Sequence, residues 1–236
     1  MSERKAYEAL SSESRLEILK LLHKKPSCVE EIAKQVSLQP VTVRQHLQSL
    51  EQAGFIESYT DKKMKTGRPK VYYKIAKEPT VVGYPKRHYL TLSNFTIRTL
   101  QSLIGAKKTG GVLKRVGKNM GENVINKIAL KHEIEKWSLE AFREIFIQKY
   151  LEEAGAEPEI VKADKNQVVY RMHNCLFLEL AVKMPEMMCD ILHEAFHEGV
   201  TSAMDGKAKI IRLTCKGQGD PYCEHRFEWQ EYPDEK

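Results

Sequence analysis

The sequence predicts an α+β protein of two domains. Apolar residues recur at helical spacing between residues 12 and 53. Segments that alternate apolar and polar residues follow in pairs, first between residues 55 and 75 and again after residue 157. Pro, Gly and charged residues without periodicity lie between these parts, at about residues 79–92. A chain of 236 residues with 42% apolar residues can bury two modest cores.

The first part is expected to begin with three helices in close succession. Ser27 and Glu30 have the spacing of a capping box, which would open the second helix. Pro40 suits the first turn of the third helix, and Gly54 would end it. The three expected helices are Ser12–Leu22, Val29–Val36 and Val41–Ala53.

The third of these helices has one apolar and one polar side. Its polar side carries amide, guanidinium and hydroxyl groups that can hydrogen-bond to the edges of bases in a major groove. These residues are Gln39, Thr42, Arg44, Gln45 and Gln48. Phe55–Tyr59 and Val71–Ile75 are then expected to form the two strands of a hairpin.

The positive charge of the chain is concentrated in the same part. The whole chain has a formal charge of +6, whereas residues 1–88 hold 17 Lys plus Arg against 10 Asp plus Glu. A run without acidic residues joins the two hairpin strands, and it contains Lys62, Lys63, Lys65, Arg68, Lys70 and Lys74. Such a run is either a solvated loop or a surface that contacts phosphates.

The order of these pieces resembles the winged helix-turn-helix of ArsR-type regulators. The matching segments are LSSESRLEILKLL, VEEIAKQVSLQPVTVRQHLQSLEQAGFI and TGRPKVYY. The resemblance implies that Val41–Ala53 enters the major groove and that Arg68, at the tip of the wing, approaches the minor groove or the backbone. It also implies a homodimer on two half-sites of double-stranded DNA. Winged helices that bind only proteins are the alternative.

The second domain is expected at residues 93–236, after a winged-helix domain at 1–78 and a linker at 79–92. Its expected helices are Asn94–Ile104, about Val112–Lys131, Ser138–Ala154 and Pro185–Ala203, and its expected strands are Glu157–Ala163, Gln167–Met172, Ala208–Cys215 and Glu224–Trp229. Two hairpins would therefore pack on helices. Gly117 and Gly121 are interpreted as close-packing positions, because the spacing of the nearby glycines does not match a phosphate-binding loop.

Four of the five cysteines lie in the last 62 residues, at Cys175, Cys189, Cys215 and Cys223. Four thiolates suit a [4Fe-4S] or [2Fe-2S] cluster, or a tetrahedral zinc ion. Alternation predicts that Cys215 shares a face with Ile211 and Leu213, beside Cys223 across the final hairpin. The N-terminal turn of its helix would favour a thiolate at Cys189. The alternative is that each thiol is a small buried apolar group, which is the interpretation for Cys28.

The segment from His193 to His197 matches the zinc-protease motif His-Glu-x-x-His. Helical periodicity places both imidazoles outward from the side of the helix that carries Cys189, so a pair that is solvated or at the boundary of the core is expected. His193 could serve as an auxiliary ligand beside Cys189. A zinc hydrolase that uses Glu194 as its general base is the alternative of a different class. We expect no catalytic residue, and therefore no enzyme.

The second domain resembles vinyl-4-reductase-type sensor domains, and its cysteine spacing with IRLTCKGQGDPYCEHRF is similar to Suf-type iron–sulfur regulators. These resemblances imply a repressor that senses redox or iron–sulfur status. A winged-helix regulator with structural zinc and a small-molecule pocket is the alternative. The charged N-terminus and the short apolar stretch at Cys175–Val182 predict neither a secretory signal nor a membrane span, and hence a cytoplasmic protein.

Overall fold

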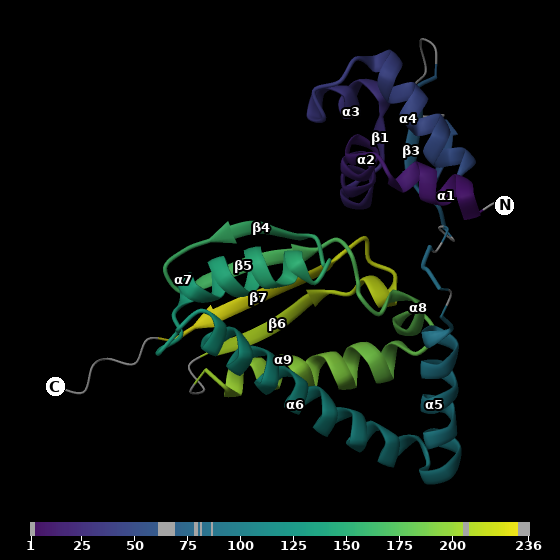
Figure 1. The fold of residues 1–236 in the computed structure, drawn as a ribbon. Coiled ribbons are helices and arrows are strands. Elements are labelled where there is room, and N and C mark those ends of the chain that lie inside the picture. The colour runs from purple at the N-terminus through teal and green to yellow at the C-terminus, as the bar shows by residue number, and fades with distance from the viewer. Residues whose placement is uncertain are drawn as a thin grey trace. The chain divides into compact units, whose positions relative to one another are not determined.

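The computed structural model describes residues 3–60, 69–77, 80, 82–85, 87–204 and 208–230 (Figure 1). The chain divides into two compact units, Met1–Arg87 and His88–Lys236. None of the helices in the described part of the chain is long and apolar enough to cross a membrane. Four basic residues of the expected wing, Lys62, Lys63, Lys65 and Arg68, lie outside the described residues.

The first unit is a winged helix-turn-helix, as expected. Its elements are α1 (Glu3–Leu10), α2 (Glu13–Lys24), β1 (Ser27–Cys28), α3 (Val29–Gln35), α4 (Pro40–Gln52), β2 (Ile56–Thr60) and β3 (Val71–Ile75). The strands form an antiparallel sheet of order β1-β3-β2, in which Ser58 faces Tyr73. The three predicted helices and both wing strands are confirmed to within two residues at each end.

Apolar side chains at helical spacing hold these helices together. Ile18 of α2, Ile32 of α3 and Leu47 of α4 are all fully buried in one cluster. The predicted cap of α3 is wrong by one residue. The carboxylate of Glu31 accepts a hydrogen bond from the backbone N–H of Cys28 at 3.0 Å, so the cap begins at Cys28 and not at Ser27. Ser27 and Cys28 form the short strand β1, which pairs with β3.

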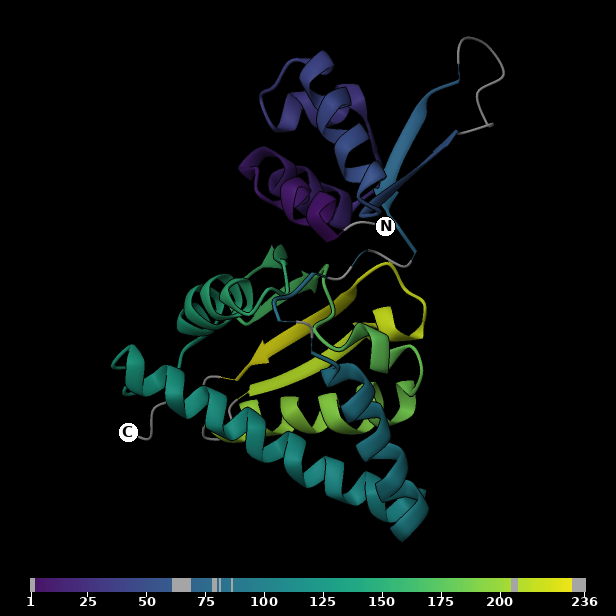
Figure 2. The same ribbon diagram turned by 45° about the vertical axis from the view of Figure 1, so that its right-hand side comes forward.

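The second unit combines helices with one four-stranded sheet (Figure 2). Its helices are α5 (Tyr89–Ile104), α6 (Ala106–Lys131), α7 (Leu139–Ala141), the π-helix η1 (Phe142–Leu151), α8 (Leu178–Ala181), the π-helix η2 (Glu186–His193), α9 (Glu194–Ser202) and the 3₁₀ turn η3 (Lys216–Gln218). Its strands are β4 (Pro158–Ala163), β5 (Gln167–Met172), β6 (Ala208–Thr214) and β7 (Cys223–Trp229).

The two predicted hairpins of this unit join into a single antiparallel sheet of order β4-β5-β7-β6. Its core lies between the sheet and the helices η1, α6 and α9. The rings of Phe142 in η1 and Phe227 in β7 stack with their centres 3.7 Å apart. The expected linker overlaps this unit, since α5 begins at Tyr89 and not near Asn94.

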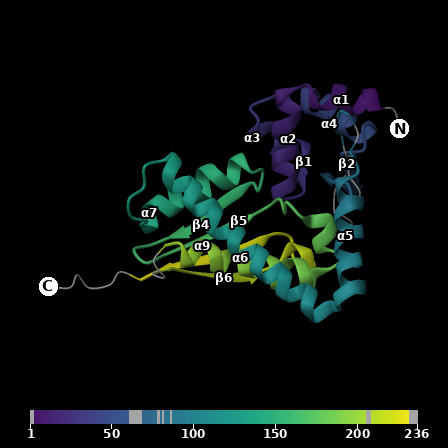
Figure 3. The same cartoon turned by 60° about the horizontal axis from the view of Figure 1, so that its bottom comes forward.

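Helix α6 lies beside α9 (Figure 3) and contacts α9 and the preceding η2 at three glycines, as expected for Gly117 and Gly121. A Cβ atom on Gly117 would lie 2.3 Å from the carbonyl oxygen of Leu192, and one on Gly121 would lie 2.1 Å from that of Phe196. From the other side, a Cβ on Gly199 would lie 2.0 Å from the carbonyl oxygen of Lys118. The two backbones therefore touch directly, and we call this contact the glycine seam.

Candidate DNA-reading surface and thiol site

Helix α4 presents the polar side chains that the sequence predicts. Gln39, Arg44, Gln45 and Gln48 are exposed, and Thr42 is half-buried. The guanidinium of Arg44 is 3.6 Å from the carboxylate of Glu30, an exposed contact that DNA phosphates can displace. Lys70 of the wing is also exposed.

Sequence reasoning missed Val41, which is 62% exposed in the first turn of α4. An apolar side chain at this end of a recognition helix can contact the methyl group of thymine. The exposure of Val41 could have been predicted from its position in the sequence. It directly follows Pro40 and lies outside the buried stripe formed by Val43, Leu47 and Leu50. Lys74, by contrast, is paired with Glu57 at 2.9 Å on the wing, which reduces its value as a phosphate contact.

In the second unit the structure brings the four cysteines together from separate elements. Cys189 lies in η2, Cys223 begins β7, Cys215 follows β6, and Cys175 follows β5. Their thiols form two hydrogen-bonded pairs, Cys175 with Cys223 and Cys189 with Cys215, and the pairs interact electrostatically with each other. We call this group the thiol site.

The structure corrects the expected arrangement of the final hairpin. The β6–β7 register shifts between Arg212 and Thr214, so a bulge at Leu213 changes which side chains face inward. Leu213 is 44% exposed whereas Cys215 is buried, and the predicted shared face is therefore wrong. The thiol of Cys223 pairs with Cys175 instead of with its hairpin neighbour Cys215.

Two donors approach the sulfur atoms of this hairpin. The backbone N–H of Lys216 donates to Sγ of Cys223 at 3.3 Å, and the guanidinium of Arg212 donates to Sγ of Cys215 at 3.7 Å. The hydrogen bond from Cys223 lowers the pKa of Cys175. Burial and the adjacent Cys215 raise the pKa of Cys189 to about 12, an effect that opposes the thiolate expected at the start of its helix.

The lack of a side chain at Gly217 leaves room for the sulfur atom of Cys189. A Cβ atom at this position would lie 2.8 Å from Sγ of Cys189 and 2.9 Å from Cβ of Ala181. The donor set fits a metal, because it contains four thiols together with N–H groups that stabilise negative sulfur. The residues that would hold an iron–sulfur cluster are Cys175, Cys189, Cys215 and Cys223.

The predicted placement of the histidine pair is wrong for His197, whereas His193 is half-buried, as a boundary position requires. His197 is only 5% exposed, and its ring lies against those of His193 and His225, with ring centres 4.3 Å and 4.8 Å away. The π-helical turns of η2 change the direction of the side chains that follow, and α6 covers the far side of α9. Sequence reasoning missed His225, although it alternates with the buried Cys223 and Phe227 along β7.

Glu194, at the general-base position of the protease motif, is engaged elsewhere. Its carboxylate lies 3.2 Å from Nε of Arg212. Burial alone would raise the pKa of Glu194, but His197 and Arg212 together hold it below its ordinary value. A carboxylate tied to a guanidinium in this way is a poor proton acceptor for hydrolysis.

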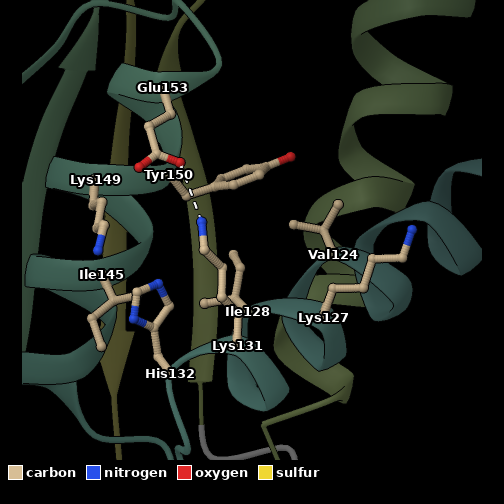
Figure 4. A pocket seen from close by; sticks show the side chains of 9 residues that line it. All are labelled: Val124, Lys127, Ile128, Lys131, His132, Ile145, Lys149, Tyr150 and Glu153. Atoms are coloured by element: carbon tan, nitrogen blue, oxygen red, sulfur yellow. Dashed lines mark ion pairs between the residues drawn. The ribbon is translucent and has the colours of Figure 1, made fainter.

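Two cavities border this unit's helices. One, of about 160 Å³, is mainly apolar and is lined by Cys175, Cys189 and Cys223 together with Met120 and Phe196. The other, of about 370 Å³, lies between α6 and η1, and Figure 4 shows Lys131 directed toward Glu153 across it, at 3.7 Å. No thiol lines this second cavity.

The first unit defines a winged-helix DNA-binding protein, and comparison with known proteins specifies the class further. Residues 12–58 match the family described as bacterial regulatory protein, arsR family. These residues therefore form an ArsR-family helix-turn-helix domain, the DNA-binding part of a transcription regulator. No curated protein matches the chain.

Several solved structures are similar to parts of the chain. The phenol-responsive sensory domain of the transcription activator PoxR is 17% identical, with a TM-score of 0.43, covering 80% of this chain and 90% of that one. A homodimeric winged helix-turn-helix domain from Mycobacterium bovis, a possible ArsR-family regulator, is 24% identical, with a TM-score of 0.28, covering 43% and 83%. A trafficking protein particle complex subunit 3 from Naegleria fowleri, covalently bound to palmitic acid, is 14% identical, with a TM-score of 0.40, covering 62% and 95%.

Proposed function

We propose that the protein is a homodimeric transcription repressor whose second unit senses redox or iron–sulfur status through a cluster held by the thiol site. The observation that carries the proposal is the convergence of four thiols from separate elements in a chain with an ArsR-family DNA-binding domain. When bound, an iron–sulfur cluster supplies a centre whose charge and stability depend on redox conditions.

The arrangement of the sulfur atoms supports a cluster over a single zinc ion. Four thiolates around one zinc ion must form one compact tetrahedron, because each Zn–S bond is only about 2.3 Å long. Within the described part of the chain, the group whose possible ligand atoms all lie within 4.8 Å of one another consists of three histidines. The four cysteines do not form such a compact group there. The thiols form two pairs, as suits ligands spaced around a larger group.

The chain's own residues connect this site to the rest of the unit. Cys189 lies in η2, which packs on α6, and α6 follows α5 after the single residue Gly105. Arg212 links Cys215 to Asp190 of η2, to which it donates at 2.5 Å. A change at the thiols would therefore move η2 against α6, and this movement would alter the dimer's spacing on two half-sites.

Helix α5 supports the homodimer. All 16 of its residues are described, and none is buried. Leu92, Phe95 and Leu103 lie toward one side of the helix and are 61%, 68% and 75% exposed. An amphipathic helix that exposes its apolar side is suited to pairing with the same helix of a second copy.

A second candidate function has its own observation. The apolar cavity of about 160 Å³ beside the thiol site can hold a small organic effector, with a structural zinc ion at the cysteines. This candidate predicts a colourless protein that contains zinc and that an apolar ligand stabilises against heat.

The test is purification of the full chain under strictly anaerobic conditions. We expect a brown protein that contains iron and acid-labile sulfide in near-equal amounts. Substitution of Cys175, Cys189, Cys215 or Cys223 by Ser should remove most of the iron, because each variant has one thiolate fewer. The matched control is Cys28→Ser, a buried cysteine of the first unit, which should leave the iron content unchanged.

Three outcomes decide between the proposals. Iron that disappears in the four variants but persists in the control supports the cluster. Zinc without colour, lost in the four variants and kept in the control, rejects the cluster in favour of the second candidate. A wild-type protein that contains no metal at all rejects both.

A further inference from the structure

Three imidazoles meet in the interior of the second unit, beside the thiol site but made of different donors. His193 ends η2, His197 follows one turn later in α9, and His225 points inward from β7. Each offers one ring nitrogen such that the three nitrogens lie within 4.8 Å of one another. The three rings come from three elements, η2, α9 and β7, so their approach is a product of tertiary packing.

Three ring nitrogens of this group have no hydrogen-bond partner among the described residues. His225 is completely buried, and neither of its ring nitrogens has a hydrogen-bond partner among the described residues. Nδ1 of His197 is likewise buried without a hydrogen bond in this part of the chain. Buried polar groups are almost always satisfied in folded proteins, so such a concentration of unsatisfied nitrogens points to a missing partner.

Charged groups beside the three imidazoles can offset the charge of a bound cation. The nearest fixed cation, Arg212, is offset by two carboxylates, Asp190 at 2.5 Å and Glu194 at 3.2 Å. The surrounding charge is therefore net negative.

Neutral imidazoles at this spacing are the ligands that zinc-class ions prefer. We propose that His193, His197 and His225 form an all-nitrogen site for a divalent transition metal ion of the zinc class, separate from the thiol site. The carboxylate of Glu194 lies beside this group, 3.9 Å from Nδ1 of His197.

Three protein ligands leave one position of a tetrahedral ion for water or a small ligand. His193 also lines the apolar cavity of about 160 Å³, which provides space beside this imidazole. The carboxylate of Glu194 is paired with Arg212, which makes it a poor general base beside this site.

The test uses the full chain, stripped of metal with a chelator under reducing, anaerobic conditions and then titrated with Co²⁺. Cobalt on nitrogen ligands gives visible d–d absorption, whereas cobalt on thiolates adds sulfur-to-metal charge-transfer absorption in the near ultraviolet. We expect the wild-type chain to bind one equivalent of Co²⁺ without charge-transfer absorption, in addition to any that the thiols bind. His193→Gln, His197→Gln and His225→Gln should each lose that equivalent and keep the thiolate signal.

The matched control is His88→Gln, which changes an exposed imidazole at the start of α5 and should retain full binding. Zn²⁺ should raise the thermal midpoint of wild type and control by more than that of the three variants, which keep only the thiols as zinc ligands. If replacement of the buried His225 prevents folding, the half-buried His193 provides the deciding variant. Unchanged cobalt stoichiometry in His193→Gln and His197→Gln, or no nitrogen-bound cobalt in the wild type, would overturn the proposal.

Discussion

On helix α4, residues buried in the core are directly followed by exposed residues that can contact DNA. Val43 and Leu47 are fully buried, while Arg44, Gln45 and Gln48 between and beside them are exposed. Buried residues fix the orientation of the helix, so the exposed ones are presented at defined angles. Phosphate contacts and base contacts should therefore be separable by single substitutions.

At this scale we predict different effects for the two kinds of contact. Arg44→Ala and Gln45→Ala should reduce discrimination between the operator and a scrambled sequence by about 1–3 kcal/mol for each base that the side chain no longer reaches. Arg68→Ala should weaken binding to all sequences alike and should make binding less sensitive to salt. Fluorescence anisotropy over a salt series measures both effects.

Gln35→Ala, an exposed position on α3, is the control and should bind as the wild type does. Unchanged affinity and discrimination in Arg44→Ala, Gln45→Ala and Arg68→Ala would contradict the assignment of this surface.

Single residues also show where sequence reasoning fails. The approach of the four cysteines could be anticipated from their clustering, but their pairing could not, because one bulged residue, Leu213, reverses the inward face of β6. His225 could have been found from the alternation of β7. Its partners His193 and His197 could not, because helical periodicity assumes α-helical geometry and η2 is a π-helix.

Among the elements, the glycine seam between α6 and α9 depends most on the absence of side chains. Its neighbours at Gly117, Gly121 and Gly199 are backbone atoms, which cannot rotate away as a side chain can. Any added methyl group must therefore separate the helices. Because α9 carries His197 and continues from η2, such a separation would also disturb the sites beside it.

We predict that Gly121→Ala lowers the free energy of unfolding by about 1–3 kcal/mol, as expected for overpacking. Urea unfolding measures the change. Gly111→Ala is the matched control in the same helix, since a Cβ there meets nothing within 4 Å. Alanine's higher helix propensity should make that control more stable by up to about 1 kcal/mol. Equal stability of the two variants would show that the helices do not touch at Gly121.

The sequence predicts most of these elements because periodicity reports burial directly. Gln167–Met172 and Val71–Ile75 match the expected strands residue for residue. The joining of the two hairpins into one sheet was not predicted, because the β5–β7 pairing links strands about 50 residues apart and leaves no local signal.

For the molecule as a whole, helix α5 matters because it exposes an apolar side formed by Leu92, Phe95 and Leu103. We predict that Leu92→Glu and Leu103→Glu each weaken self-association about 10-fold or more, because burying a leucine contributes roughly 1.5–3 kcal/mol. Sedimentation equilibrium measures the dissociation constant. Arg98→Glu places the same acid on another side of α5 and should associate as the wild type does. A monomeric wild-type protein, or dimers unaffected by either leucine variant, would contradict the prediction.

The single residue between α5 and α6 has a consequence for how the molecule could transmit a signal. Gly105 has a φ of +79° and a ψ of 157°, a conformation that is essentially restricted to glycine. Because only Gly105 separates the two helices, α5 cannot stay in place when α6 rotates. A rotation of α6 would therefore change the direction of α5, and with it the position of the exposed apolar side that we expect to form the dimer.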